Sequence, residues 1–439
     1  MRLERRNLLE RVRAREAKVG VVGMGYVGLP LSLAFAEAGF PVVGLDVDPR
    51  KIAAIGRGES YFRHIESGPL GKAVGEGRLR ATADFAQARE LDCLVICVPT
   101  PLTAAREPDM SYIVNTAESL APHLRPGQLV SLESTTWPGT TDEVLRPILE
   151  RGGLKAGVDF YLAFSPERED PGGHSAKTVP KVVGGYSPAC LEVACELYGA
   201  AVPRVVPVSS TRVAELAKLL ENIFRSVNIA LVNELKMLCD RMGLDVWEVI
   251  DAASTKGFGF MPFYPGPGLG GHCIPIDPFY LTWKAREFEM QTRFIELAGE
   301  INTNMPYYVV QRAFEALNRE GRALKDAKIL VLGVAYKKDI DDVRESPAVR
   351  VIELLQERGA KVSYHDPFIP KIPKMRAHSL QLESQPLTAE SLAAADAVMV
   401  LTDHSSLDYA WVVRESKLVI DTRNATRAAP GAEGKVVKA

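Results

Sequence analysis

Short apolar runs alternate with helical patterns over the first part of the chain. The runs, each followed by a polar or glycine-rich segment, cover residues 18–22, 41–45, 91–98, 128–133 and 160–164. Apolar runs of strand length that alternate with helices are typical of a parallel sheet covered by helices on both faces. The pattern therefore predicts a doubly wound, Rossmann-like α/β domain over residues 1–208.

At Ser209 the spacing of the apolar residues changes to that of one long helix. Its apolar positions recur at helical spacing, at Val213, Leu216, Ala217, Leu220, Phe224, Val227 and Leu231. Further helix is predicted over residues 248–253 and 279–288. We predict an all-helical middle domain over residues 209–318, which is a candidate interface for a homodimer or a higher homo-oligomer.

The last third returns to the alternation of the first. Strands are predicted over residues 327–335, 361–366, 397–401 and 418–421, and they define a second Rossmann-like domain over residues 319–439. The predicted fold class is therefore α/β, with two Rossmann-like doubly wound domains joined by a long central helix in an all-helical middle domain.

Composition narrows the classes of function. The chain of 439 residues has a net charge of −2, which argues against a nucleic-acid partner. It has no apolar run of about 18 residues, so no membrane span is expected. The six cysteines and seven histidines show no disulfide framework and no metal-ligand spacing, which favours a cytoplasmic protein without a metal site. Residues 1–18, rich in Arg and Glu, predict a solvated helix.

A glycine-rich turn follows the first run and carries Gly23, Gly25 and Gly28, with Tyr26 and Val27 between them. The second run ends in Asp46. Glycines in such a turn let the backbone approach a pyrophosphate, and an acid at the end of the next strand binds the ribose hydroxyls. A carboxylate there repels a 2′-phosphate, so we predict NAD rather than NADP. Lys51 could contact the adenosine side, although a solvated lysine at a helix start is the simpler interpretation.

Three polar loops follow the later strands of this predicted domain. They contain Thr100, Thr136, and the pair Glu167 and Arg168. The carboxyl ends of parallel strands meet at one edge of a sheet, so these loops are expected to converge on the nicotinamide end of the cofactor site. Helix capping is the alternative role for Glu167 and for Glu133.

Residues 265–277 form a loop rich in glycine and proline around one thiol, Cys273, with Asp277 four residues later. A rigid, glycine-lined loop suits a reactive thiolate, whereas a small buried hydrophobe is the alternative. On the long helix, Lys218 and Asn222 lie one turn apart, away from the apolar stripe. The alternative is a solvated polar face, but Ile229 and Val232 interrupt that face.

Residues 336–347, after the first strand of the last domain, are dense in cations that include Lys337 and Arg344. Cations at the carboxyl end of a strand suit a phosphate-bearing ligand, and a solvated charge run is the alternative.

Together these motifs resemble the UDP-sugar 6-dehydrogenases, over residues 18–424. The resemblance implies a four-electron, NAD-dependent oxidation of the C6 alcohol of a UDP-sugar to a carboxylate, for the synthesis of polysaccharide precursors. By motif, it implies catalytic roles for Cys273, Lys218, Asn222, Glu167, Asp277 and Thr136. It also implies cofactor contacts at Gly23, Gly25, Tyr26, Val27, Gly28, Asp46, Lys51, Thr100, Thr136 and Arg344. The implied substrate contacts are Glu167, Arg168, Lys218, Asn222, Gly270 and Lys337.

Two segments bear on the substrate. Glucose-type members read Asn-Pro-Glu-Phe-Leu and Gly-Gly-Ser-Cys-Phe-Pro-Lys-Asp, whereas this chain differs over residues 165–170 and 271–277. Both segments are more similar to members that act on UDP-N-acetylhexosamines, above all UDP-GlcNAc, with UDP-ManNAc, UDP-GalNAc and UDP-glucose as alternatives. A two-electron hydroxy-acid dehydrogenase would need neither Cys273 nor a third domain. An inactive NAD-binding sensor would lose Cys273 or Lys218.

Overall fold

The computed structural model describes residues 2–62, 65–103, 107–168, 179–271, 274–373, 375, 378 and 380–439. Cys273 lies outside the described residues. The chain separates into two compact units, Met1–Glu221 with Phe279–Met290, and Asn222–Pro278 with Gln291–Ala439. The three-domain division at residues 208 and 318 remains a prediction.

The first unit is built on one large sheet. Within the described residues its eight strands follow the order β3-β2-β1-β4-β5-β6-β7-β8, and all neighbours are parallel except β6 and β7. The strands are β1 (Val19–Val22), β2 (Val42–Leu45), β3 (Leu79–Thr82), β4 (Cys93–Ile96), β5 (Leu129–Leu132), β6 (Tyr161–Phe164), β7 (Lys181–Gly185) and β8 (Val205–Val208). The carboxyl ends of β1, β2, β4, β5 and β6 consequently share one edge, where the predicted cofactor residues follow.

Helices cover both faces of this sheet. They are α1 (Arg2–Arg13), α2 (Gly28–Glu37), α3 (Pro49–Gly56), α4 (Ser67–Gly75), α5 (Ser111–Leu120), α6 (Arg146–Leu149) and α7 (Pro188–Gly199), with short helical turns at Phe85–Glu90, Ala121–His123, Thr141–Leu145 and Glu150–Gly152. Side chains of α1, α2 and α7 share one buried cluster, and those of α5 and α6 share another. Alternate residues of each strand point to opposite faces of the sheet. Because helices cover both faces, consecutive residues of the central strands are mostly apolar.

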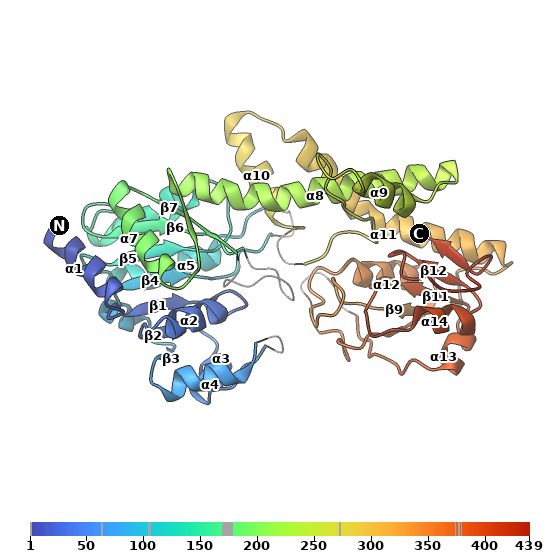
Figure 1. Cartoon of the computed structure of the whole chain (residues 1–439), viewed down its shortest axis with the longest axis horizontal. Coiled ribbons are helices and arrows are strands. Elements are labelled where there is room, and N and C mark those ends of the chain that lie inside the picture. The colour runs from blue at the N-terminus through green and yellow to red at the C-terminus, as the bar shows by residue number, and fades with distance from the viewer. Residues whose placement is uncertain are drawn as a thin grey trace. The chain divides into compact units, whose positions relative to one another are not determined.

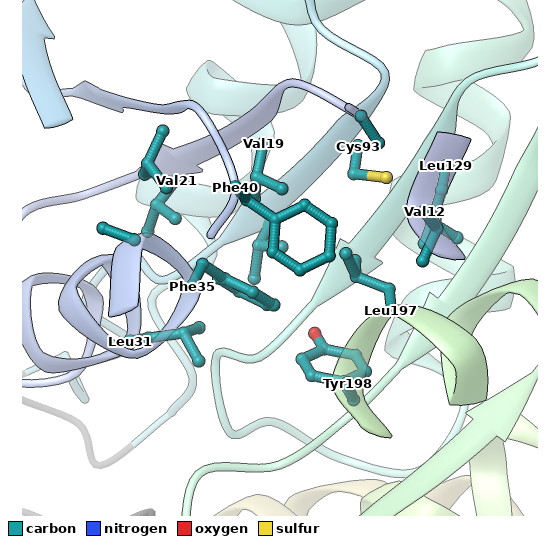
Figure 2. Close-up of a cluster of buried hydrophobic side chains, with 14 of the residues drawn as sticks. Val12, Val19, Val21, Leu31, Phe35, Phe40, Cys93, Leu129, Leu197 and Tyr198 are labelled. Atoms are coloured by element: carbon teal, nitrogen blue, oxygen red, sulfur yellow. The ribbon is translucent and has the colours of Figure 1, made fainter. Parts of the chain in front are cut away.

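The cluster under α1, α2 and α7 contains several large side chains, among them Phe35, Phe40 and Tyr198. Figure 2 shows Phe35 and Phe40 at its centre, and their rings meet edge to face at 6.0 Å. Val12 of α1 points into the same cluster, and Leu8 and Leu9 are buried too. The N-terminal helix is thus present as predicted, but the expectation that it is solvated was wrong, since its apolar face packs on the domain.

The second unit carries the other sheet. Its five described strands are parallel in the order β10-β9-β11-β12-β13, namely β9 (Lys328–Leu332), β10 (Lys361–His365), β11 (Ala397–Val400), β12 (Val419–Asp421) and β13 (Val436–Lys438). The helices of this unit include α9 (Val246–Ser254), α11 (Arg293–Arg319), α12 (Pro347–Glu357), α13 (Ala389–Ala394) and α14 (Tyr409–Glu415). Both sheets are visible in Figure 1. Their strand orders confirm the α/β fold class with two Rossmann-like parts.

Two helices continue from one unit into the other. They are α8 (Thr211–Met242), the long green helix of Figure 1, and α10 (Asp277–Ala285), which a turn at Arg286–Phe288 extends. On α8 the apolar stripe is the exposed side, with Leu216, Leu220 and Phe224 all more than 40% accessible. Lys218 and Asn222 are instead buried, at 6% and 0% exposure, so a solvated polar face is wrong for this pair.

Candidate functional site

The turn between β1 and α2 is closed by two of its glycines. Gly23 has a φ of +91°, and a Cβ added to it would lie 2.6 Å from the carbonyl oxygen of Cys97. A Cβ on Gly28 would lie 1.9 Å from the Gly23 carbonyl oxygen, whereas nothing lies within 4 Å of one on Gly25. Gly23 and Gly28 therefore let strand and helix pack closely, and Gly25 leaves an open approach to the backbone.

Asp46 anchors this turn from the end of β2. Its buried carboxylate accepts hydrogen bonds from the backbone N–H of Met24 (2.8 Å), that of Asp48 (2.8 Å), and the Lys51 ammonium (2.9 Å). Lys51 thus pairs with Asp46 rather than extending into solvent, while its contact with adenosine remains a prediction. The open glycine turn beside an anchored acid fits a dinucleotide with free ribose hydroxyls.

The loops after β4 and β5 are held by α10. The Tyr280 hydroxyl donates to the Thr100 carbonyl oxygen at 2.5 Å, and the Trp137 ring lies 4.7 Å from that of Trp283. Between these anchors, Thr136 is buried, and its hydroxyl has no hydrogen-bond partner within the described part of the chain. A buried hydroxyl without a partner costs free energy unless a ligand satisfies it, which agrees with the predicted role of Thr136 at the cofactor.

A buried carboxylate on α8 fixes the same loop. Glu215 accepts from the backbone N–H of Gly139 (2.6 Å), the backbone N–H of Thr141 (2.9 Å) and the Thr141 hydroxyl (2.7 Å). Burial raises the pKa of Glu215 to about 7, against the opposing effect of these donors. Sequence reasoning missed this residue, which lies one helical turn before Lys218 and binds the segment that follows Thr136.

Lys181, at the start of β7, joins the ends of two other strands. Its ammonium lies 2.8 Å from the Glu133 carboxylate and 3.5 Å from that of Glu167. Burial raises the pKa of Glu133 to about 7. Burial alone would lower the pKa of Lys181, but the two carboxylates outweigh it and hold the pKa above its usual value. Glu133 thus pairs with a lysine instead of capping a helix.

Arg168 lies beside this cluster and has a carboxylate partner. Its guanidinium pairs with Glu221 of α8 at 2.6 Å and donates to the Pro180 carbonyl oxygen at 2.6 Å. Glu221 lies next to Asn222 in sequence and was not predicted. The role of Arg168 toward a substrate remains a prediction.

In the second unit, α8 and the start of α10 bring two predicted catalytic residues together. The Asn222 amide donates to the Asp277 carboxylate at 2.5 Å, and the amide oxygen of Asn222 accepts from Arg225 at 2.8 Å. Asn222 and Asp277 are both buried although they lie 55 residues apart. The Asn222 N–H is thus directed at a carboxylate in this structure.

The glycine-rich segment before Cys273 packs on the loop after β9. A Cβ on Gly270 would lie 2.6 Å from the Cβ of Tyr336, and the Gly271 N–H donates to the Arg344 carbonyl oxygen at 3.3 Å. The Arg344 guanidinium in turn pairs with the buried Asp342 at 2.6 Å. The segment with Gly270 therefore meets the stretch that carries Lys337 and Arg344, as a shared site would require.

Within the described part of the chain, no three His, Cys, Asp or Glu side chains group as metal ligands. None of the described helices is long and apolar enough to cross a membrane.

Three sequence models of one protein family match the chain in succession. They represent the NAD binding domain (residues 17–202), the central domain (residues 212–304) and the UDP binding domain (residues 330–428) of the UDP-glucose/GDP-mannose dehydrogenase family. The chain belongs to this family. The predicted family, the enzyme class and the NAD cofactor are thereby confirmed: the protein is an NAD-dependent UDP-sugar dehydrogenase.

Relatives within the family span nearly the whole of this dehydrogenase. The UDP-N-acetyl-D-mannosamine dehydrogenase of Pyrococcus horikoshii is 34% identical over 421 residues, which are 94% of this chain and 97% of that protein. The UDP-N-acetyl-D-glucosamine 6-dehydrogenase of Pseudomonas aeruginosa is 34% identical over 395 residues, 89% of this chain and 91% of that protein. The solved structure of the Pyrococcus horikoshii enzyme superposes with a TM-score of 0.85 at 33% identity, covering 94% of this chain and 97% of its own.

Proposed function

We propose that this dehydrogenase oxidises the C6 alcohol of a UDP-N-acetylhexosamine to the carboxylate, in two successive two-electron steps on one enzyme. The observation that carries the proposal is the buried hydrogen bond between Asn222 and Asp277. Asp277 lies four residues after Cys273 in the sequence. Burying a polar side chain is costly unless it is hydrogen-bonded, so this bond fixes Asn222 and Asp277 relative to each other.

The first oxidation requires loss of the hydroxyl proton at C6. We propose that Lys218, or a water held by Asp277 or Thr136, accepts that proton. All three side chains are polar and buried. NAD, when bound, supplies the hydride acceptor. Gly25 would let the backbone approach its pyrophosphate, while Gly23 and Gly28 close the turn.

The second oxidation requires that the aldehyde stay on the enzyme. We assign its capture to the thiolate of Cys273, as a thiohemiacetal whose oxyanion accepts hydrogen bonds from Lys218 and Asn222. Loss of a hydride from C6 of that adduct to a second molecule of NAD yields a thioester on Cys273. Water activated by Glu167 then releases the carboxylate and restores the thiol. In the second unit, Lys337 would neutralise the UDP pyrophosphate, which matches the UDP binding domain of the family.

The N-acetylhexosamine class is supported by residues 165–170 and 271–277 and by the named substrates of the two relatives. We rank UDP-GlcNAc first, by the resemblance of these segments. UDP-ManNAc is the second candidate because the Pyrococcus horikoshii relative carries that name. The product, a uronate of the nucleotide sugar, suits polysaccharide precursor synthesis.

We further propose a homodimer through the exposed stripe of α8. Leu216, Leu220 and Phe224 leave an apolar surface along the helix that a second copy would bury.

The test is kcat/KM for UDP-GlcNAc, UDP-ManNAc, UDP-GalNAc and UDP-glucose under one set of conditions, with the NADH released per sugar. We expect two NADH per sugar. We also expect a preference above tenfold for an N-acetyl substrate over UDP-glucose, because groups of the site that hydrogen-bond the acetamido group would be left unpaired when UDP-glucose is bound. One NADH per sugar would contradict the mechanism, and a preference for UDP-glucose would contradict only the substrate.

Cys273→Ser tests the nucleophile separately. The variant should lose nearly all turnover and keep its affinity for NAD, because the glycine turn and Asp46 are unchanged. Turnover at the unmodified rate would remove Cys273 from the mechanism.

A further inference from the structure

Lys181 is a buried cation that the proposed reaction does not use. Its ammonium contacts the carboxylates of Glu133 (2.8 Å) and Glu167 (3.5 Å) and the Pro166 carbonyl oxygen (3.4 Å). The Tyr198 ring of α7 lies 5.3 Å from the ammonium, and the side chain is 6% exposed.

The topology explains why the lysine lies between two strand ends. Glu133 follows β5 and Glu167 follows β6, and both strands end at the cofactor edge of the sheet. Lys181 opens β7, which runs antiparallel to β6 with Phe164 opposite Gly184, so its first residue lies beyond the end of β6, beside the segment that carries Glu167. A parallel β7 would begin at the opposite edge, far from both carboxylates.

The two carboxylates are held differently. The Oε2 atom of Glu133 is paired with Lys181, and its Oε1 atom has no hydrogen-bond partner within the described residues. The side chain of Glu167 is half-buried, near a small recess lined by Pro166, Arg168 and Pro180. Glu133 therefore fixes the ammonium from the interior, and the other N–H groups of the ammonium are directed at the Pro166 carbonyl oxygen and at Glu167.

We propose that Lys181 is a positioning residue that holds the Glu167 carboxylate, ionised and correctly oriented, for hydrolysis of the enzyme-bound thioester. This rests on the proposed role of Glu167. In that step the water oxygen bonds to the thioester carbonyl carbon, and the C–S bond breaks with its electron pair leaving on the Cys273 sulfur. Glu167 takes a proton from the water. Lys181 itself touches neither substrate nor cofactor in this scheme.

The test is Lys181→Met, which keeps the length of the side chain and removes its charge. Hydrolysis should slow by about 10²-fold, the usual scale for a misplaced catalytic group. Rapid mixing should show a burst approaching two NADH per active site, followed by slow turnover. Intact-mass measurement should show the sugar acyl group accumulating on the protein.

The pH profile and a conservative variant separate positioning from packing. A nearby cation favours the ionised carboxylate, so the acidic limb of the kcat profile should move to higher pH in Lys181→Met. Lys181→Arg should restore both the limb and most of the turnover. A purely structural lysine would lower the melting temperature and every step together, without a burst and without a shift of the limb.

Removing Lys181 leaves Glu133 buried and uncompensated, which could prevent folding. The double variant Glu133→Gln/Lys181→Met removes both charges and should recover the melting temperature while the acyl-enzyme still accumulates. Full recovery of turnover in the double variant would overturn the proposal. Lys155→Met is the matched control, because Lys155 pairs with Glu150 at 3.2 Å on the surface of the same unit, and it should change nothing.

The two proposals fail in different ways. If the unmodified enzyme forms no Cys273 adduct and releases one NADH per sugar, the proposed function is wrong. If it releases two NADH and Cys273 is required, but Lys181→Met shows no burst and no shift of the limb, only the role of Lys181 is wrong.

Discussion

Glu215 provides the most direct test of how the loop around Thr136 is held. The carboxylate is completely buried, and it is the acceptor for the backbone N–H groups of Gly139 and Thr141. In Glu215→Ala both N–H groups would lose their acceptor inside the protein. Each buried, unpaired donor costs about 1–3 kcal/mol, so the closed loop should be destabilised by about 2–6 kcal/mol.

The perturbation is local, and hydrogen exchange measures it locally. Because about 1.4 kcal/mol corresponds to a factor of ten, amide exchange in a peptide covering residues 137–143 should accelerate at least about thirtyfold. The KM for NAD should rise as well, since this loop carries Thr136. Glu215→Gln should have a smaller effect, because its amide oxygen can still accept from Thr141 while its NH₂ group faces the Gly139 N–H.

Glu118→Ala is the control for loss of a carboxylate. Glu118 pairs with Arg151 at 2.8 Å on the surface of the same unit. Exposed pairs of this kind contribute about 0–1 kcal/mol, and exchange in the peptide over residues 137–143 should not change. If Glu215→Ala accelerated exchange there less than threefold, the three hydrogen bonds to Glu215 would not be holding the loop.

Three further predictions concern the other parts of the site. Asn222→Ala should lower kcat by about 10²–10³-fold with the circular dichroism spectrum unchanged, and a loss below tenfold would contradict its role as an oxyanion donor. Asp46→Ala should raise the KM for NAD and weaken discrimination against NADP, whereas equal use of both cofactors by the unmodified enzyme would refute the selectivity argument. Leu220→Glu, at a position 62% exposed on α8, should dissociate the proposed dimer in sedimentation, and the loop variant Val158→Glu, at a position 55% exposed, should not.

Features that depend on local backbone geometry could be predicted from the sequence. Gly23 and Gly28 are required because a side chain at either would collide with the backbone, and this requirement is visible in the spacing of the glycines. Central strands such as β4 and β6 are buried on both faces, so their sequences are continuous apolar runs. The strands that were missed carry weaker patterns. In β3 and β8 most residues are only half-buried or exposed, and β7 contains two glycines.

Periodicity identifies which residues of a helix share a face, but the tertiary structure decides which face is covered. The apolar stripe of α8 would ordinarily be assigned to the core, yet Leu220 and Phe224 are exposed, and Lys218 and Asn222 are buried. The same limit applied to α1, whose charged composition concealed the buried Val12. Burial depends on what packs against the helix, and that information lies in other segments of the chain.

The supporting residues of the site were set by pairings across the sheet. Lys181 meets Glu133, 48 residues earlier, only because β7 lies antiparallel beside β6. Glu215 reaches the loop after Thr136 from 74 to 76 residues away, through the position of α8. The sequence by itself determined the glycine turn, the acid at Asp46 and the residue types suited to the chemistry, because these follow from local geometry and spacing. The tertiary structure alone decided which buried charges compensate one another, since the energy of a buried charge depends on partners that folding brings within a few ångströms.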